Sequence, residues 1–443
     1  MSHSSPSDPG EGPRFQLLPG ESYFRVDGRP EFVLGRNPAG MSPQAFDDHF
    51  RQAAAAGERF MRIHFTFSPP REKAGEIDAA ILQAWDAILD AAGNRGLAVL
   101  PVLGVWADWN DGSGNAPWHR WDRNPFNAEV GGPAKQPGEL FDDTPCRRLW
   151  LKRLETFVVH WSHRRAIVGW EIFSELDLVT GVNEERAVLF TERAAAVIRA
   201  ADPWKRPVTA SLTAVNEWPK LLTNQSLDFI EIHPYANGVS GRLDDLIIST
   251  VHDRLAKYRK PVLLGECGLD ARAPRGTLDI AERAEIGIRH AIWASVVSGA
   301  MNGRMLWWQD GYDQFEHADL CSRYHQAAAP AAAFVRGVDY TGFGPVACAL
   351  SRGVKGAMIG NAKKRLGWFR DVACEPPDWP IRPMSGQTVT VDAPGDSWQV
   401  EFVDPVTGKA TGGSRLAVLD GRLRIALPEF QGSIAVRLKR AEP

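Results

Sequence analysis

The 443-residue chain has few cysteines and almost no net charge. Its five cysteines are odd in number and scattered, without a CxxC pair or a cysteine–histidine cluster. This distribution supports neither a disulfide framework nor a zinc site, and we expect no metal and no cofactor. A formal net charge of −3 lacks the positive excess typical of nucleic-acid-binding proteins, so we expect no nucleic-acid partner.

Long hydrophobic runs are also missing. No run approaches the length of a membrane span, which predicts no membrane partner. The first residues are rich in Ser, Pro and Gly and lack the apolar stretch of a signal peptide. We therefore expect a disordered tail over residues 1–20 and a cytoplasmic location, unless an export signal was trimmed from the chain. The oligomeric state stays open.

Nucleotide-binding motifs are absent too. Neither GxGxxG nor GxxxxGK[ST] follows any candidate strand, which argues against a nucleotide-binding fold. Tryptophan, by contrast, is abundant, with 16 residues against 6 tyrosines. Because indole is large, flat and costly to expose to water, this surplus indicates either large cores or stacking platforms for flat ligands.

Short apolar runs alternate with amphipathic helical stretches between residues 31 and 308. Several runs are continuously apolar, as expected for parallel strands that are covered on both faces. This pattern predicts an α/β fold, a (β/α)8 TIM barrel over residues 21–335. The runs Tyr23–Val26 and Glu31–Leu34 flank a turn at Asp27-Gly28, and we expect this hairpin to start the barrel or to cap its bottom. The eight expected strands are Glu31–Gly35, Phe60–Phe65, Leu97–Leu103, Ala166–Phe173, Pro207–Leu212, Asp228–His233, Pro261–Glu266 and Gly303–Trp308.

After residue 336 the helical periodicity disappears. Short β-rich runs follow, separated by Gly, Pro and Asp turns, and they predict a small C-terminal antiparallel β-sandwich over residues 336–443. We expect this domain to pack on the barrel and to stabilise it. The expected strands are Ala347–Ser351, Thr388–Val391, Trp398–Val403, Leu416–Leu419, Leu423–Ala426 and Ser433–Leu438.

Function in a barrel of this kind lies on the loops that follow the carboxyl ends of the strands. Two carboxylates stand there among aromatic and basic residues, and no metal-ligand pattern or Ser/His/Asp arrangement competes with them. Hydrolysis of an acetal needs such a pair, one carboxyl to protonate the leaving oxygen and one to attack or to activate water. The residues at these ends are Arg62, His64, Trp106, Glu175, His233, Tyr235, Glu266, Trp307 and Trp308.

Two motifs resemble those of clan A glycoside hydrolases similar to family 5. The segment Gly169–Glu175, GWEIFSE, is similar to the fourth strand of that family, which ends in Asn-Glu. The segment Leu264–Gly268, LGECG, resembles the Gly-Glu-Phe-Gly of its seventh strand. The resemblance implies that Glu175 is the general acid/base and Glu266 the nucleophile of a retaining enzyme. It also implies a β-linked gluco- or manno-configured oligosaccharide or glycoside as the substrate.

The same resemblance assigns other residues of the site. The segment His233–Tyr235 is similar to the His-x-Tyr of the sixth strand, whose aromatic hydroxyl contacts the nucleophile. Arg62 matches the arginine that keeps the nucleophile ionised, and Trp307 and Trp308 match the region of the sugar-stacking tryptophan. For a retaining mechanism we expect the two carboxyl groups to lie about 5–5.5 Å apart.

One departure from the family pattern is Ser174, which stands where the family has Asn. That Asn donates a hydrogen bond to the sugar 2-hydroxyl, and Ser is too short to do the same directly. Either another residue contacts the 2-hydroxyl, or the sugar is unusual at C2, or catalysis is weak. A catalytically weak or inactive carbohydrate-binding barrel is therefore the alternative function, and a scaffold acting through the C-terminal domain is a third hypothesis.

Several residues also have a structural interpretation. Glu171 shares a strand face with Glu175 but lies deeper, so we interpret it as a structural residue paired with Arg62. His233 is equally consistent with a hydrogen-bonded core histidine. We expect His64 to hold the catalytic residues in place rather than to act in catalysis itself. The tryptophans of the long loop after the third strand either pack that loop or line the cleft, and we expect at least one to line it: Trp106, Trp109, Trp118 and Trp121.

Overall fold

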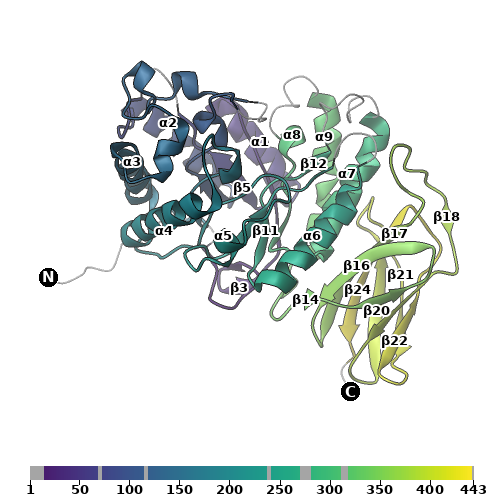
Figure 1. Cartoon of the computed structure of the whole chain (residues 1–443). Coiled ribbons are helices and arrows are strands. Elements are labelled where there is room, and N and C mark those ends of the chain that lie inside the picture. The colour runs from purple at the N-terminus through teal and green to yellow at the C-terminus, as the bar shows by residue number, and fades with distance from the viewer. Residues whose placement is uncertain are drawn as a thin grey trace.

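The computed structural model describes residues 14–67, 72–113, 118–236, 241–269, 281–310 and 318–441. Most of the predicted tail, residues 1–13, and part of the long loop, residues 114–117, lie outside these ranges. Figure 1 shows an α/β part, coloured purple to green, beside a β-rich part in yellow-green. The second part begins after the last helix, α10 (Ala328–Val335).

Eight parallel strands follow one another around the α/β part. Six of them form one sheet, in the order β13-β4-β5-β6-β7-β8, and β9 pairs with β11. A parallel bridge between Ser211 and Glu231 joins β8 to β9, and the Met301 N–H donates to the Val262 carbonyl at 2.8 Å beside β11 and β13. This arrangement is consistent with a (β/α)8 barrel. The strands are β4 (Val33–Arg36), β5 (Phe60–His64), β6 (Ala98–Val102), β7 (Trp170–Glu171), β8 (Val208–Thr209), β9 (Ile230–Ile232), β11 (Val262–Leu264) and β13 (Asn302–Arg304).

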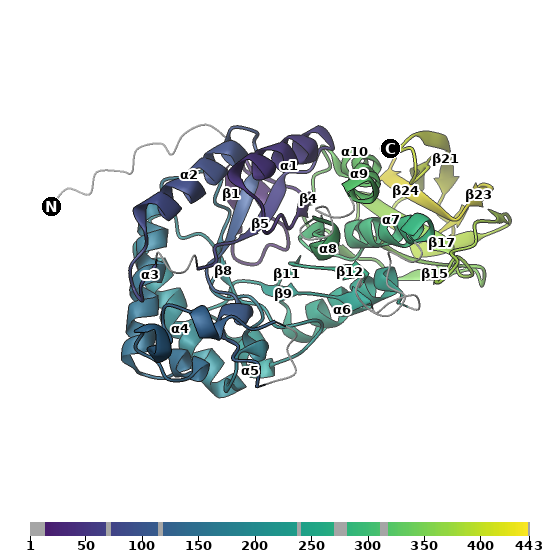
Figure 2. The same ribbon diagram turned by 90° about the horizontal axis from the view of Figure 1, so that it is seen from above.

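Helices surround these strands, as the view from above shows (Figure 2). The first begins as its sequence predicts, since the Ser42 side chain accepts from the Ala45 N–H and Pro43 occupies the first turn. Its Phe46 and Phe50 are buried against the strands. None of the described helices is both long enough and apolar enough to cross a membrane. The others are α2 (Ala79–Gly93), α3 (Pro145–Trp161), α4 (Glu184–Ala201), α5 (Pro219–Thr223), α6 (Leu243–Tyr258), α7 (Ala281–Val297), α8 (Trp307–Asp310) and α9 (Ala318–Gln326), and the first is α1 (Pro43–Ala55).

A small antiparallel sheet closes the end of the barrel at which the strands start. It consists of β1 (Phe15–Gln16), β2 (Arg25–Val26) and β3 (Arg29–Pro30). Phe24 packs its ring 6.0 Å from that of Phe60 and 6.2 Å from that of Phe229. Without this hairpin, the apolar residues at this end of the core would be exposed to water.

Two expectations for this region are corrected. The tail was predicted to be disordered up to residue 20, but Phe15 lies in β1 and is only 4% exposed, since it packs into the closed end. The hairpin does turn at Asp27-Gly28, where both φ angles are positive. Its second arm, however, is β3 and not the segment from Glu31 to Leu34, because the chain from Val33 onward is the first barrel strand.

The C-terminal β domain contains two larger antiparallel sheets that share a core. Side chains from both sheets meet in one cluster, including Phe369, Val391 and Trp398. The six-stranded sheet has the order β14 (Gly344–Pro345), β16 (Val354–Gly360), β17 (Lys364–Asp371), β24 (Ser433–Arg440), β20 (Ser397–Val403) and β21 (Ala410–Ala417). The three-stranded sheet has the order β15 (Cys348–Leu350), β19 (Thr388–Asp392) and β22 (Arg422–Ala426), and β18 (Pro383–Met384) pairs with β23 (Phe430–Gln431).

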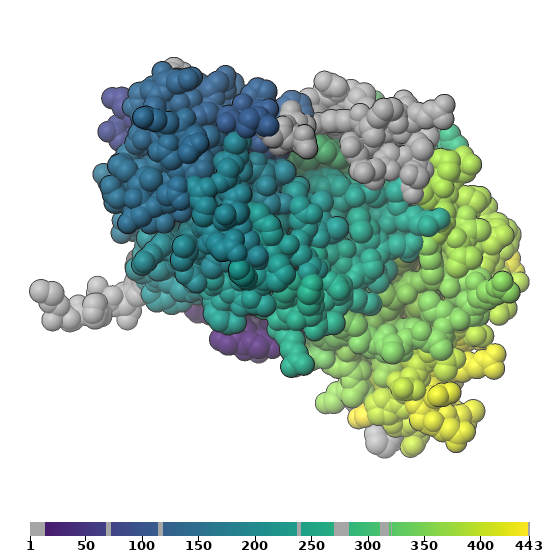
Figure 3. Space-filling model, in the orientation of Figure 1, coloured from purple at the N-terminus to yellow at the C-terminus, as the bar shows by residue number. Residues whose placement is uncertain are grey.

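The other face of the six-stranded sheet packs on the barrel helices. Helix α7 contacts β16 and β17, and the surfaces of the two parts are continuous in Figure 3. The Trp293 Nε1–H of α7 donates to the Pro405 carbonyl at 3.1 Å, and the buried Arg370 pairs with Asp244 of α6 at 2.5 Å. The barrel and the β domain are therefore joined by a buried interface.

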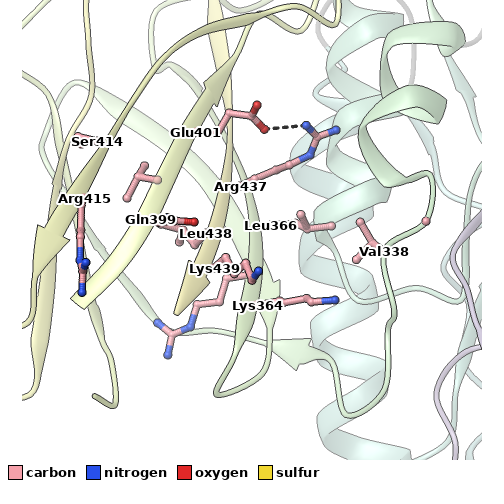
Figure 4. A pocket seen from close by; sticks show the side chains of 13 residues that line it. Val338, Lys364, Leu366, Gln399, Glu401, Ser414, Arg415, Arg437, Leu438 and Lys439 are labelled. Atoms are coloured by element: carbon pink, nitrogen blue, oxygen red, sulfur yellow. Dashed lines mark hydrogen bonds and ion pairs between the residues drawn. The ribbon is translucent and has the colours of Figure 1, made fainter. Parts of the chain in front are cut away.

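A cavity of about 590 Å³ lies over one face of the neighbouring strands β17, β24, β20 and β21, beside the segment that connects the barrel to the β domain (Figure 4). Arg437 crosses it and pairs with Glu401 at 2.7 Å. The same guanidinium donates to the Phe334 carbonyl of α10 at 3.0 Å. None of the predicted site residues lines this cavity, so it belongs to the junction between the two parts.

Candidate active site

The two predicted catalytic carboxylates come together at the carboxyl ends of the strands. Glu175 follows β7 and Glu266 follows β11, which are the fourth and seventh strands of the barrel. One carboxylate oxygen of each, together with a ring nitrogen of His233, lies within 4.8 Å of the others. Both glutamates are largely buried, at 7% and 4% exposure. Residues 91 positions apart thus share one small volume at the barrel mouth.

Glu175 occupies a strained backbone position. Its φ and ψ angles are 59° and 58°, the left-handed region that non-glycine residues seldom adopt. Ser211, beyond β8, holds this turn, because its hydroxyl accepts from the Glu175 N–H at 3.0 Å and its carbonyl accepts from the Leu176 N–H. The turn takes the side chain out of the strand direction, and Glu175 Oε1 lies 2.8 Å from His233 Nδ1.

Glu266 is bound on both oxygens. Arg62 Nη1 donates to Oε1 at 2.7 Å, and the Tyr235 hydroxyl donates to Oε2 at 2.5 Å. Tyr235 stands at the rim in β10 (Tyr235–Ala236), which pairs with β12 (Gly268–Leu269) just after Glu266. Charge-assisted hydrogen bonds of this kind orient the carboxylate and stabilise its ionised form.

These contacts move the pKa values of the two carboxyls in opposite directions. Burial alone would raise both. For Glu266 the charges of His233 and Arg62 and the Tyr235 hydroxyl outweigh burial and lower its pKa to about 2. For Glu175 burial dominates, and the negative charge of Glu266 adds to it, so its pKa is raised despite the hydrogen bond to His233. Two carboxyls with divergent pKa values are the pattern of an acid paired with an ionised partner.

Arg62 of β5 is the buried centre of the site. Its guanidinium binds Glu171 at 2.7 and 2.8 Å in a bidentate pair, in addition to Glu266. It also donates to the Ser174 hydroxyl at 2.9 Å. Burial raises the pKa of Glu171 to about 7, although the Arg62 charge opposes this. Ser174, at the position of the family's Asn, is thus engaged with Arg62 and is only 2% exposed.

The two histidines of the site have opposite charge states. Burial and the Arg62 charge lower the pKa of His64 far below its ordinary value, so this imidazole is neutral. Its Nε2 lies 3.9 Å from Glu266 Oε1, and its ring meets that of Trp307 edge-on at 5.0 Å. For His233 the charge of Glu266 and the hydrogen bond to Glu175 outweigh burial, and its pKa is raised to about 10.

The aromatic residues divide into two groups. Trp307 and Trp308 at the start of α8 lie beside His64 and Tyr235, with ring centroids 5.0 and 5.8 Å apart respectively. In the long loop, Trp109 is fully buried and, with Trp121 and Phe126, packs the loop interior.

Trp106 lies nearer the carboxylates. It is partly exposed, and its backbone N–H donates to the Ser174 carbonyl at 3.2 Å. Trp118 is 54% exposed. The described part of the loop contains the short 3₁₀ turns η1 (Trp106–Trp109), η2 (Trp121–Arg123), η3 (Ala128–Val130) and η4 (Pro137–Phe141), and η5 (Leu176–Leu178) follows Glu175.

Three residues of the site were not predicted. Ser211 shapes the turn at Glu175, and the Asn37 amide donates to the Gly265 carbonyl at 2.6 Å next to Glu266. Glu231 of β9 lies below His233, fully buried against Arg62. A signal for Glu231 was present, because a charged residue inside an apolar strand, two positions before His233, must share the inward face with it.

Among the described residues, three groups of carboxylates and imidazoles come close enough together to hold a metal ion. They are Glu171/Glu231/His233, Glu175/His233/Glu266 and His49/Asp310/His325. Each already has a guanidinium bound to one of its carboxylates, Arg62 in the first two and Arg304 in the third. Since this charge satisfies the carboxylates, we assign none of these residues as metal ligands.

Comparison with solved structures identifies the fold as that of the glycoside hydrolases, which confirms the expected resemblance at this level. One glycoside hydrolase structure matches with a TM-score of 0.64 and 12% identity over 97% of each chain. A glycoside hydrolase of family 5 from Bacteroides vulgatus matches at 0.63 and 11% identity, over 96% of this chain and 93% of that one. An exo-β-1,4-mannosidase from Opitutaceae bacterium strain TAV5 matches at 0.52 and 20% identity, over 71% of this chain and 62% of that one. No protein-family model and no curated protein matches the sequence.

Proposed function

We propose that the protein is a retaining glycoside hydrolase. The observation that carries the proposal is the pair Glu175 and Glu266, whose nearest oxygens lie within 4.8 Å and whose pKa values diverge. Retaining enzymes hold their carboxyls about 5–5.5 Å apart, whereas inverting enzymes need about 6.5–9.5 Å to admit a water molecule. The short separation favours double displacement.

In the first step Glu266 attacks the anomeric carbon while the bond to the leaving oxygen breaks. Glu175 gives its proton to that oxygen, and a covalent glycosyl-enzyme forms. In the second step water attacks the same carbon, its proton passes to Glu175, and Glu266 departs as a carboxylate. Arg62 and Tyr235 hold Glu266 ionised and aligned for the attack.

For the substrate we propose a β-linked gluco- or manno-configured oligosaccharide or glycoside. The support is the resemblance of the strand-end motifs, together with the exo-β-1,4-mannosidase of similar fold. Trp307 offers an indole beside His64, close to Glu266, on which the apolar face of a sugar ring would stack.

Hydrolysis of aryl β-glycosides and of mannan and β-glucan oligosaccharides tests the proposal. Glu175→Gln should lower turnover of substrates with poor leaving groups by roughly 10²- to 10⁴-fold. Glu266→Ala should be inactive, and azide should rescue it with a glycosyl azide of inverted configuration. Azide with Glu175→Ala should give the retained product, because the nucleophile is still present.

An unchanged rate in Glu175→Gln would contradict the proposed chemistry. The alternative function, a carbohydrate-binding barrel without turnover, has a different signature. Wild type, Glu175→Gln and Glu266→Ala would then bind the same oligosaccharides with similar affinity, and no variant or condition would release a reducing sugar.

A further inference from the structure

Glu231 lies directly beneath the proposed acid/base machinery. Its side chain is fully buried, with a carboxylate oxygen 2.7 Å from Arg62 Nε and 3.6 Å from His233 Nε2. The neighbouring strand leaves room for it, since a Cβ at Gly265 would lie only 2.0 Å from Glu231 Oε1. The absence of a side chain at position 265 therefore allows a carboxylate at position 231.

A third buried carboxylate here needs a reason, because an ionised group in the interior is costly unless it is paired. Arg62 already makes a bidentate pair with Glu171 and binds Glu266. His64 is neutral. Arg62 also lies 2.7 Å from Glu231, so its single positive charge faces three carboxylates. The imidazolium of His233, 3.6 Å from Glu231, supplies a second positive charge.

The ring of His233 has a carboxylate at each nitrogen. Nδ1 lies 2.8 Å from Glu175 Oε1, and Nε2 lies 3.6 Å from Glu231 Oε1. A neutral imidazole carries one N–H and would turn a lone pair toward one of these carboxylates. An imidazolium donates from Nδ1 to Glu175 and turns its Nε2–H toward Glu231, at an ion-pair distance that is too long for a hydrogen bond. Charged and titratable groups face His233 from four sides. They are Glu231 from β9, Glu171 from β7 with Glu175 and Asp177 after it, Glu266 from the end of β11, and Arg62 and His64 from β5.

We propose that Glu231 is a positioning residue that keeps His233 as an imidazolium. His233 Nδ1 and Glu175 Oε1 are 2.8 Å apart and share one proton, which passes to Glu175 when Glu175 protonates the leaving group. The inference rests on the proposed function, since it names the group that sets the working range of the acid. A nearby negative charge favours the protonated form of every group around it. The Glu231 carboxylate therefore raises the pH at which the pair of His233 and Glu175 loses its shared proton.

The decisive experiment compares pH profiles of kcat/KM. Glu231→Gln keeps the shape of the side chain and removes its charge, so the basic limb should move about 1–3 units to lower pH. Glu231→Asp keeps the charge and should leave the limb close to that of the wild type, which separates charge from packing. Thermal unfolding of each variant shows whether it is folded at the pH values used.

A double-mutant cycle tests whether Glu231 acts through His233. In a His233→Asn background, Glu231→Gln should no longer move the basic limb, because the group that transmits its charge is gone. An unmoved limb in Glu231→Gln alone, or an equal shift with and without His233, would overturn the proposal.

A second readout does not need turnover. In protein labelled with ¹⁵N-histidine, the resonances lost in His233→Asn identify His233. They should report an imidazolium at pH 7 in the wild type and deprotonation about 1–3 units lower in Glu231→Gln. A neutral His233 ring at pH 7 in the wild type would refute the inference, whatever the activity. Activity that survives Glu175→Gln would instead refute the proposed function. The titration of the His233 ring would then still test whether Glu231 keeps that ring protonated.

Discussion

Tyr235 holds one oxygen of Glu266 through a 2.5 Å hydrogen bond from its hydroxyl. In Tyr235→Phe the ionised carboxylate loses this donor, so the pKa of Glu266 should rise from about 2 by about 1–2 units. Because Glu266 must be ionised to attack, the acidic limb of the kcat/KM profile should move to higher pH by the same amount. A limb that stays in place would show that the hydroxyl does not stabilise the carboxylate.

Ser174 accepts a hydrogen bond from Arg62 at the centre of the buried charge network. Ser174→Ala leaves an N–H of the guanidinium without this partner in the interior, which should lower the free energy of unfolding by about 1–3 kcal/mol. Ser249→Ala, at an exposed position of α6, is the matched control and should change stability by less than about 0.5 kcal/mol. Urea denaturation measures both, and equal effects would contradict the assignment.

The candidate site was predictable where a residue type and a strand end coincide. Glu175, Glu266 and Arg62 stand at the ends of apolar runs, and the barrel rule gathers such ends at one rim. Ser211 and Asn37 could not be selected in this way, because a serine or an asparagine after a strand is common in any loop. Their roles depend on which neighbour they face, which only the closed ring determines.

At the scale of elements, a buried network of ion pairs lies where the first barrel strand, β4, pairs with the last, β13. Glu58, between α1 and β5, pairs with Arg36 of β4 and with Arg304 of β13 at 2.8 Å. Arg304 in turn pairs with Asp310 of α8 at 2.6 Å. All four side chains are fully buried, so removing one leaves uncompensated charge in the interior.

Glu58→Ala should therefore lower the free energy of unfolding by about 3–5 kcal/mol. The exposed pair between Arg51 and Asp48 provides the control, and Asp48→Ala should cost less than about 1 kcal/mol because water screens it. Chemical denaturation of both variants measures the difference. A loss below about 1 kcal/mol in Glu58→Ala would mean that the network adds little to the closure.

The eight barrel strands predicted from apolar runs each overlap a strand of the structure, although β7 and β8 are only two residues long. Apolar composition records burial, whereas strand bounds depend on the neighbour's hydrogen bonds, so the lengths were less predictable. In the β domain, β16 and β17 were missed, and so were the two-residue strands β14, β18 and β23. β17 is buried on both faces yet contains Gly367 and Arg370, so it shows neither alternation nor a continuous apolar run.

At the scale of the molecule, the largest hydrophobic core does not stop at the end of the barrel. One cluster contains barrel residues such as Trp293 together with Ile359, Leu366 and Trp368 of the β domain. A second cluster, with Trp398, lies inside the β domain. Since the first core belongs to both parts, the barrel and the β domain should unfold together in one cooperative transition.

Trp368→Ala tests this coupling. Trp368 is fully buried in the shared cluster, 5.4 Å from the ring of His290 in α7, and its removal should cost about 3–5 kcal/mol. Because the loss falls on the interface, calorimetry should resolve two transitions in this variant, where the wild type shows one. Trp398→Ala removes an equal side chain from the inner core of the β domain and leaves the interface intact, so a single transition at lower temperature is expected. Two transitions in the wild type would show that the shared core does not couple the two parts, and the β domain would then not be a stabilising element of the barrel.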